Sequence, residues 1–450
     1  MRLPAPSRRV RVLVLVLALP LAGGGAATVL SQTSDAQADA VAPQAADPGA
    51  DSPRPKRLPQ RSPEERAVQK LLDARAEAVL SSDRDAFLKT VDPRQKSFRR
   101  SQGRMLDALA EVPLTDWSYV LQTGPPTAQA GSALLAWGSR SRSMQVRFRY
   151  GMRGETADRE GTPRTVTVTR RGGRFFISAD EALNGDGTRQ RYLWDEGPVA
   201  VAKGRRSLVL GHPGSESELR SVADAADAAV PNVSSVWGRD WSRRVVVVLP
   251  DTQAELGRLT GSDADEVANT AGVAVSERTV TRDTRNDTKV FLNPVVLRRL
   301  DARQRRMLLA HEVTHVATAA SNGYRTPDWL VEGLAEHVEH RASGLTARQV
   351  AVTLGPRVRA GRVPRELPTD TDLDVADRRT AAWSYEASWL AVELLVERYG
   401  TAKTVRLYRA IGASDVPSQL AVDDALDEVL GSGEKQFTKA WRKYLVTSLG

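Results

Sequence analysis

The chain contains no cysteine among its 450 residues. This absence excludes disulfide scaffolds, thiolate zinc sites, thiol-based catalysis and lipid attachment through cysteine. Apolar runs long enough for a membrane are also absent beyond the N-terminus, which excludes a protein that crosses a membrane many times. The net charge of +9, from 64 basic and 55 acidic residues, is not gathered into a basic stripe. We therefore expect no nucleic-acid partner.

Histidine is scarce but concentrated. Four of the five histidines fall within residues 311–340, and such clustering indicates a metal site. The apolar content of 41% is sufficient for globular cores, and the length corresponds to about three domains at roughly 150 residues each. The solitary His212 lies before a proline, and we interpret it as a loop residue.

Residues 1–30 have the pattern of an export signal. Arg8, Arg9 and Arg11 precede an apolar run, and small residues that suit cleavage follow it. The uncharged stretch is also just long enough to be an uncleaved membrane anchor, so membrane attachment through this segment stays open. Residues 31–62 are rich in Ala, Pro, Asp, Gln and Ser without periodicity, which is typical of a disordered linker. We expect an extracellular or cell-surface protein.

Residues 63–200 are predicted to form an α+β domain. Ser62 and Pro63 mark a helix start, and a second helix is expected over 101–110. Later segments alternate apolar and polar residues with a period of two, and a hairpin is expected at 171–173. Helices followed by an antiparallel meander resemble the layout of the nuclear transport factor 2-like (NTF2-like) cone fold. No acid, base or nucleophile converges here, which favours a structural or binding module.

Residues 205–450 are predicted to form a second α+β domain. Strands are expected over 207–210, 243–249, 271–275 and 289–292. A helix is expected to begin at Ser215, with Glu218 completing a capping box. From Asp301 onward the pattern is almost entirely helical, which predicts a small sheet followed by a helical lobe.

The most informative motif is the run His311-Glu312-Val313-Thr314-His315. Asp301 is the expected N-cap and Gly323 the expected C′ residue of one helix that contains the motif. Histidines at i and i+4 stand on one helix face and can chelate Zn²⁺. Glu312 is placed to take a proton from water rather than to bind the metal.

A third ligand is available on the next predicted helix. Thr326 is its expected N-cap, and the helix returns antiparallel beside the first, bringing Glu332 to the metal, with Asp328 as a distant alternative. Gly333 would let the two helices approach closely. Three protein ligands with one open position is the arrangement of catalytic zinc.

The segment Trp329–Glu336 resembles the "W-L-x-E-G-x-A-E" helix of the gluzincin metallopeptidases. The resemblance is specific over 311–336 and points to the peptidase MA-like family, which is related to the M1 aminopeptidases. It implies Zn²⁺ held by His311, His315 and Glu332, and it implies a hydrogen bond from Glu336 to a ligand histidine.

A second segment, Ser384–Trp389, resembles the "Y-x-x-S" helix of the related families. It implies that Tyr385 donates a hydrogen bond to the developing oxyanion. The strand over 271–276 is expected either to hold a peptide along its edge or to be an ordinary hairpin strand. His337 and His340 are interpreted as packing or surface residues.

Three functions compete at this point. The favoured one is an exported zinc-dependent peptidase that acts on a peptide or protein substrate with Glu312 as general base. The alternative is a non-catalytic cell-surface binding protein that retains a metal site. A third is a protein whose N-terminal domain binds a ligand while the metal motif is residual. The sequence leaves the oligomeric state open.

Overall fold

The computed structural model describes residues 61–122, 141–153, 161–181, 191–276, 288–323, 326–374, 377–414, 416 and 418–450. The expected export segment and nearly all of the expected linker lie outside these residues. Among the described residues, no helix has the length and apolar character needed to cross a bilayer. The chain mixes helix and sheet, as the α+β prediction requires.

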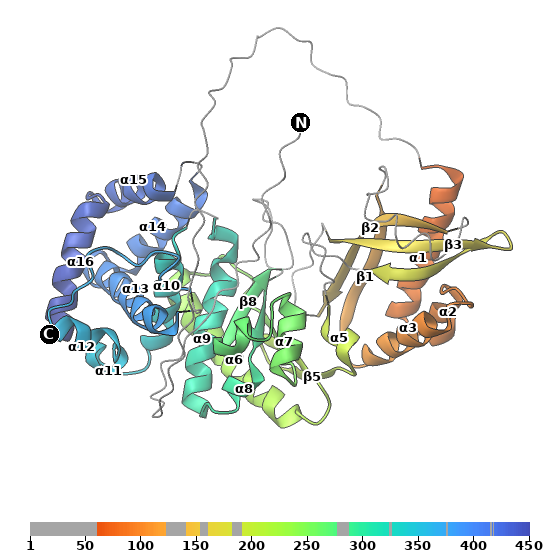
Figure 1. The fold of residues 1–450 in the computed structure, drawn as a ribbon, viewed down its shortest axis with the longest axis horizontal. Helices are drawn as coiled ribbons and strands as arrows, with labels where there is room; N and C mark the ends of the chain where they lie inside the picture. The colour runs from red at the N-terminus through yellow and green to blue at the C-terminus, as the bar shows by residue number, and fades with distance from the viewer. Residues whose placement is uncertain are drawn as a thin grey trace, which may run out of the picture.

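The N-terminal part consists of three helices followed by a four-stranded antiparallel meander (Figure 1). Its elements are α1 (Pro63–Leu80), α2 (Arg84–Lys89), α3 (Lys96–Ala108), β1 (Leu114–Leu121), β2 (Ser141–Met152), β3 (Thr162–Arg171) and β4 (Arg174–Glu181). The helix start at Ser62 is confirmed, since Ser62 and Glu65 form a reciprocal capping box. The second expected helix begins five residues earlier than predicted, at Lys96, and the short α2 was missed.

The hairpin expected at 171–173 joins β3 to β4. Arg171 pairs with Arg174, and the two intervening glycines have φ values of +51° and +80°, which residues with a side chain rarely adopt. The helices-then-meander layout is therefore present. The finer NTF2-like assignment stays a prediction.

A second sheet of five strands follows, in the order β5-β6-β7-β9-β8. These strands are β5 (Ala200–Lys203), β6 (Ser207–Gly211), β7 (Val245–Val248), β8 (Gly272–Ser276) and β9 (Thr288–Leu292). The three central strands are parallel, and the edge strands β5 and β8 run antiparallel to their neighbours. The boundary expected at residue 200 thus falls on the first residue of β5, which belongs to this second sheet.

The remaining elements are helices. They are α5 (Leu193–Glu196), α6 (Glu216–Trp237), α7 (Gln253–Thr260), η2 (Glu266–Asn269), α8 (Pro294–Leu297), α9 (Ala302–Thr318), η3 (Ala319–Ser321), α10 (Asp328–His340), α11 (Ala347–Val350), α12 (Leu354–Arg359), α13 (Arg378–Tyr399), α14 (Thr401–Ala413), α15 (Ser418–Leu430) and α16 (Glu434–Leu449). Figure 1 shows α10 to α16 gathered in one lobe beside α9 and the second sheet.

Both faces of the second sheet are buried. Val245 and Val247 pack with α6, α9 and the helical lobe, whereas Val246 and Val248 pack in a cluster that also contains Trp117 of the first sheet. Alternate residues of one strand therefore serve two cores. The N-terminal part and the second sheet share the core that contains Trp117.

Three predictions about helix ends are wrong: the capping box of Ser215 with Glu218, the N-cap at Thr326 and the helix end at Gly323. Ser215 precedes α6, but its hydroxyl donates to the His212 carbonyl instead of capping, so the capping box with Glu218 does not form. Glu218 pairs instead with Arg298 and Arg305. Thr326 is not the N-cap of α10, because Pro327 occupies that position.

Gly323 also has a different role from the one expected. The α-helix ends at Thr318, and one 3₁₀ turn follows it. A β-carbon at Gly323 would lie 2.4 Å from the Gly412 carbonyl oxygen of α14, which is far inside van der Waals contact. This glycine therefore permits a close approach to α14 and is not a left-handed cap.

Candidate metal centre

The motif helix α9 forms as predicted. The Asp301 carboxylate accepts hydrogen bonds from the backbone N–H groups of Arg303 and Gln304, and the Gln304 side chain accepts the Asp301 N–H in return. One turn separates His311 from His315, and the centroids of their rings are 4.8 Å apart. Both imidazoles are buried.

Helix α10 brings a carboxylate to these two rings. Glu332 Oε2 lies 3.3 Å from His311 Nε2 and 3.7 Å from His315 Nε2. The three residues each offer a ligand atom, and these atoms lie within 4.8 Å of one another. Asp328 belongs to none of the metal-capable groups found among the described residues. The structure therefore brings together the three residues expected to bind the metal.

These three ligand atoms fit a bound cation. His311 Nε2, His315 Nε2 and Glu332 Oε2 are all buried without a hydrogen-bond partner among the described residues. Unpaired polar atoms are costly in a protein interior, and a cation at their centre would satisfy all three. Two imidazole nitrogens and one carboxylate oxygen form a donor set typical of catalytic zinc.

The electrostatics of the group reflect its burial. Burial and the neighbouring His311 lower the pKa of His315, which favours the neutral imidazole that binds metals. Burial raises the pKa of Glu332 to about 7 and that of Glu312 to about 8. A bound cation would stabilise the ionised carboxylates in this setting.

The carboxylate nearest to His311 Nδ1 belongs to Glu339, and not to Glu336 as the resemblance implied. Glu339 Oε2 lies 3.2 Å from His311 Nδ1, whereas Glu336 Oε1 lies 3.8 Å from the same nitrogen. Glu336 instead accepts a hydrogen bond from His340 Nε2 at 2.9 Å. About two helical turns separate Glu332 from Glu339, so both lie on the same face of α10 and reach the same ring. Sequence reasoning missed Glu339.

The carboxylate of Glu312 lies against strand β8 of the second sheet. Its side chain is fully buried, and neither of its carboxylate oxygens has a hydrogen-bond partner among the described residues. A β-carbon at Gly272 would lie only 2.6 Å from Glu312 Oε1. The first residue of the edge strand β8 must therefore be a glycine for Glu312 to occupy this position.

Tyr385 lies on α13, which packs directly on α10. A β-carbon at Gly333 would lie 2.4 Å from the Ser388 carbonyl oxygen, so Gly333 permits the contact with α13 and not, as predicted, the contact with α9. Burial raises the pKa of Tyr385, and the carboxylates of Glu332 and Glu336 raise it further. These influences put the phenol near the carboxylates of the site, while its part in the reaction stays a prediction.

The other histidines of α10 serve packing. His337 Nδ1 lies 2.7 Å from Glu393 Oε1, and the His340 ring lies against Trp389 with centroids 5.3 Å apart. Neither histidine belongs to a metal-capable group among the described residues.

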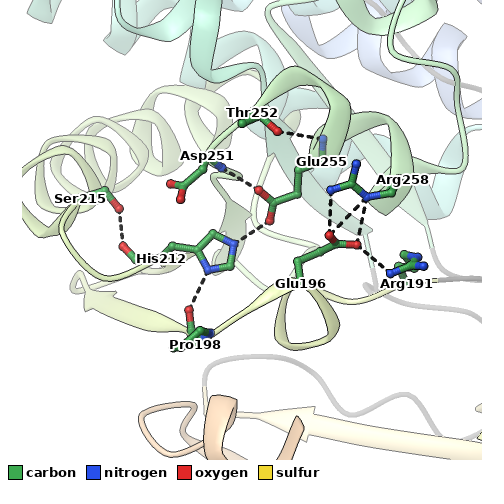
Figure 2. A network of polar contacts seen from close by, with 9 residues as sticks. All are labelled: Arg191, Glu196, Pro198, His212, Ser215, Asp251, Thr252, Glu255 and Arg258. Carbon is green, nitrogen blue, oxygen red and sulfur yellow. Dashed lines mark hydrogen bonds and ion pairs between the residues drawn. The ribbon is translucent and has the colours of Figure 1, made fainter. Parts of the chain in front are cut away.

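His212 lies in the loop directly after β6, as expected, but its side chain is buried. Figure 2 shows its ring between the Pro198 carbonyl oxygen, 2.7 Å from Nδ1, and the Glu255 carboxylate, 2.6 Å from Nε2. The hydrogen bond to Glu255 is the main reason that the pKa of His212 is raised to about 9. Beside it, Glu196 forms a double hydrogen bond with Arg258 of α7. No sequence pattern connects residues 43 positions apart, so this network could not be foreseen.

No family model and no curated protein matches this chain. Solved structures that resemble it include the M1 zinc metallopeptidase from Deinococcus radiodurans, at 14% identity with a TM-score of 0.32, covering 68% of this chain and 62% of that one. A mutant of that enzyme bound to a Tyr-Ser-Ala substrate matches at 15% identity with a TM-score of 0.31, covering 61% of this chain and 58% of that one. The chain thus spans about three-fifths of the length of these structures. Likeness at this level does not define a family for this chain.

Proposed function

We propose that this chain is a zinc-dependent peptidase of the gluzincin type. The observation that carries the proposal is the convergence of His311, His315 and Glu332, whose three unpaired buried ligand atoms lie within 4.8 Å of one another. The group has three protein ligands, which leaves a position open, as catalytic zinc requires and structural zinc does not. This supports a catalytic protein over a non-catalytic binding protein.

The residues of the site divide the chemistry of peptide hydrolysis among them. His311, His315 and Glu332 would hold a zinc ion, which would supply a Lewis acid for the scissile carbonyl. Glu312 accepts the proton of the attacking water and passes it to the leaving amine. Tyr385 donates a hydrogen bond to the carbonyl oxygen as negative charge develops on it.

The edge strand β8 is the proposed holder of the peptide substrate. Within the described sheet, β8 pairs with β9 on one side and has no strand on the other. An extended peptide can add to such an edge through backbone hydrogen bonds. Because Gly272 of β8 touches Glu312, a peptide bound along this edge would lie beside the general base.

Export through residues 1–30 and the finer family assignments belong to the same proposal. The layout of residues 63–200 supports an NTF2-like domain, and the order of sheet and helices after residue 200 supports a peptidase MA-like domain. We propose that the protein acts outside the cell or at its surface, because residues 1–30 have the sequence pattern of an export signal.

The test combines metal content with peptide cleavage. The purified chain should contain about one zinc per molecule and cleave members of a quenched fluorescent peptide library. His315→Ala should lose both properties, whereas Glu312→Gln should lose cleavage alone. A zinc-loaded wild-type chain that cleaves no peptide in a broad library would favour the non-catalytic alternative.

A further inference from the structure

Two arginines are buried inside the N-terminal part, far along the chain from the metal helices. Arg75 of α1 is 0% exposed and Arg164 of β3 is 9% exposed. Both reach the same carboxylate on β4, since Arg75 Nη2 lies 3.8 Å from Asp180 Oδ2 and Arg164 Nη1 lies 3.5 Å from Asp180 Oδ1. The sequence analysis expected no converging acid, base or nucleophile in this part of the chain, and it did not foresee this cluster.

The charges of this cluster do not balance. Arginine stays protonated in proteins, so two guanidinium groups face one carboxylate and leave one positive charge in excess. Among the described residues, Asp180 is the only acid at ion-pair distance from either arginine. Burial raises the pKa of the neighbouring Tyr119, which keeps that phenol neutral and unable to supply the missing negative charge. Uncompensated buried charge is strongly unfavourable.

Each arginine also has an unused hydrogen-bond donor. The Nε atoms of Arg75 and Arg164 are buried and have no partner among the described residues. The two terminal nitrogens of Arg75 each donate one hydrogen bond, to Thr90 and to Gln102. Aromatic rings stack on both guanidinium groups, with Phe87 4.1 Å from Arg75 and Phe148 3.9 Å from Arg164. Stacking lowers the cost of burial but cannot accept the Nε–H groups in the guanidinium plane.

We propose that Arg75, Arg164 and Asp180 form a binding site for one small monocarboxylate anion. A single negative charge neutralises the excess, whereas a phosphate dianion would exceed it. The planar donors of arginine match the two oxygens of a carboxylate. Apolar ring walls favour a compact anion that carries little polar surface beyond its carboxylate. The site is independent of the metal centre and of the proposed peptidase activity.

The proposal is tested by titrating sodium acetate into the full-length chain and following heat and the midpoint of thermal unfolding. Wild type should bind about one acetate per chain in a saturable manner, with a rise in the midpoint. Arg164→Met should lose the binding. Asp180→Asn should bind acetate at least tenfold more tightly, because the competing carboxylate is removed. Arg142→Met is the matched control, since that β2 arginine is 69% exposed, and it should bind as wild type does.

Absence of saturable binding to the wild type, or unchanged binding in Arg164→Met, would overturn the proposal. Chloride that binds as tightly as acetate would overturn the carboxylate assignment. If circular dichroism shows that Arg164→Met does not fold, Asp180→Asn decides the matter, because unchanged or weaker acetate binding in that variant contradicts the charge argument.

Discussion

At the scale of single residues, the proposed mechanism depends on which carboxylate binds the metal and which one transfers protons. Glu312 and Glu332 are both buried within one site, yet Glu332 faces the two imidazoles and Glu312 lies against Gly272. These positions support the proposal that Glu332 binds the metal and Glu312 transfers protons, although burial raises the pKa of both.

Glu312→Gln should keep the metal and lose hydrolysis. The amide has nearly the shape of the carboxylate but cannot accept a proton at neutral pH, and general-base catalysis typically contributes 10²–10⁴-fold. Steady-state cleavage of a peptide substrate and metal analysis of the same preparation provide the measurement. A variant that cleaves as fast as wild type would remove Glu312 from the mechanism.

Glu339→Gln should weaken zinc binding by about 10–100-fold, because the carboxylate 3.2 Å from His311 Nδ1 fixes the orientation of that ligand ring. The matched control is Glu336→Gln, whose carboxylate lies farther from the ring and is bonded to His340, and it should have a smaller effect. Competition with a chelator of known affinity measures both. The reverse order of effects would restore Glu336 to the role that the sequence suggested.

Tyr385→Phe should lower turnover by roughly 10²–10³-fold with little change in zinc content, which is the usual cost of losing one oxyanion donor. The ring stays, so the packing of α13 on α10 is kept. Comparison of kcat with zinc content and thermal midpoint separates a catalytic loss from a folding defect. Wild-type kcat in the variant would mean that the donor lies elsewhere, with backbone N–H groups of β8 as the next candidates.

At the scale of elements, sequence patterns were sufficient where the determinant was local. The helix starts at Ser62 and Asp301 and the glycine hairpin before Arg174 depend on neighbours along the chain, and they form as predicted. The apolar strand β7 also forms, within the range expected for it. Contacts between elements that are far apart along the chain could not be predicted from such local patterns. Gly333 was correctly seen as a point of close approach, but its partner is α13, which begins 45 residues later.

The His212–Glu255 contact is an element-scale feature with a pH signature. The folded-state pKa of about 9 lies above the ordinary value of 6.5, so its stabilising contribution is fully present below about pH 6.5. This contribution should be lost as pH rises through about 9, because deprotonation ends the charged contact between β6 and α7. The free energy of unfolding, measured by urea titration from pH 6.5 to 9.5, should therefore fall more steeply in wild type than in His212→Gln.

The control for this prediction is Arg258→Gln. It breaks the neighbouring ion pair with Glu196 but leaves both partners of the His212 ring in place, so it should keep the wild-type pH slope. Equal slopes in wild type and His212→Gln would show that the histidine is not an imidazolium in the folded protein.

At the scale of the whole molecule, the N-terminal part and the second sheet pack together more closely than the sequence indicates. The sequence predicted two domains divided near residue 200. In the structure, strand β5 of the second sheet starts at that residue. Trp117 of the first sheet shares a core with Val246 and Val248 of the second sheet. The four valines of strand β7 are all buried, but nothing in their sequence indicates which layer covers each face of the sheet. That knowledge requires the tertiary arrangement.

The fold also explains how a site made of three short segments becomes one centre. Helix α9 supplies two histidines and Glu312, α10 returns beside it with Glu332, and α13 packs against α10 at Gly333. Gly272 of strand β8 lies against the carboxylate of Glu312. The ligands of the centre could be predicted from motif spacing, whereas Glu339 and the contact with β8 depend on packing between elements.

The most direct test is the metal stoichiometry of the purified full-length chain, measured by mass spectrometry of the element beside Glu332→Ala and Glu339→Ala. The account predicts about one zinc per wild-type chain, almost none in Glu332→Ala, and zinc that is retained but more easily removed by a chelator in Glu339→Ala. A wild-type chain without zinc after growth in zinc-containing medium, or a Glu332→Ala chain with full zinc, would contradict it.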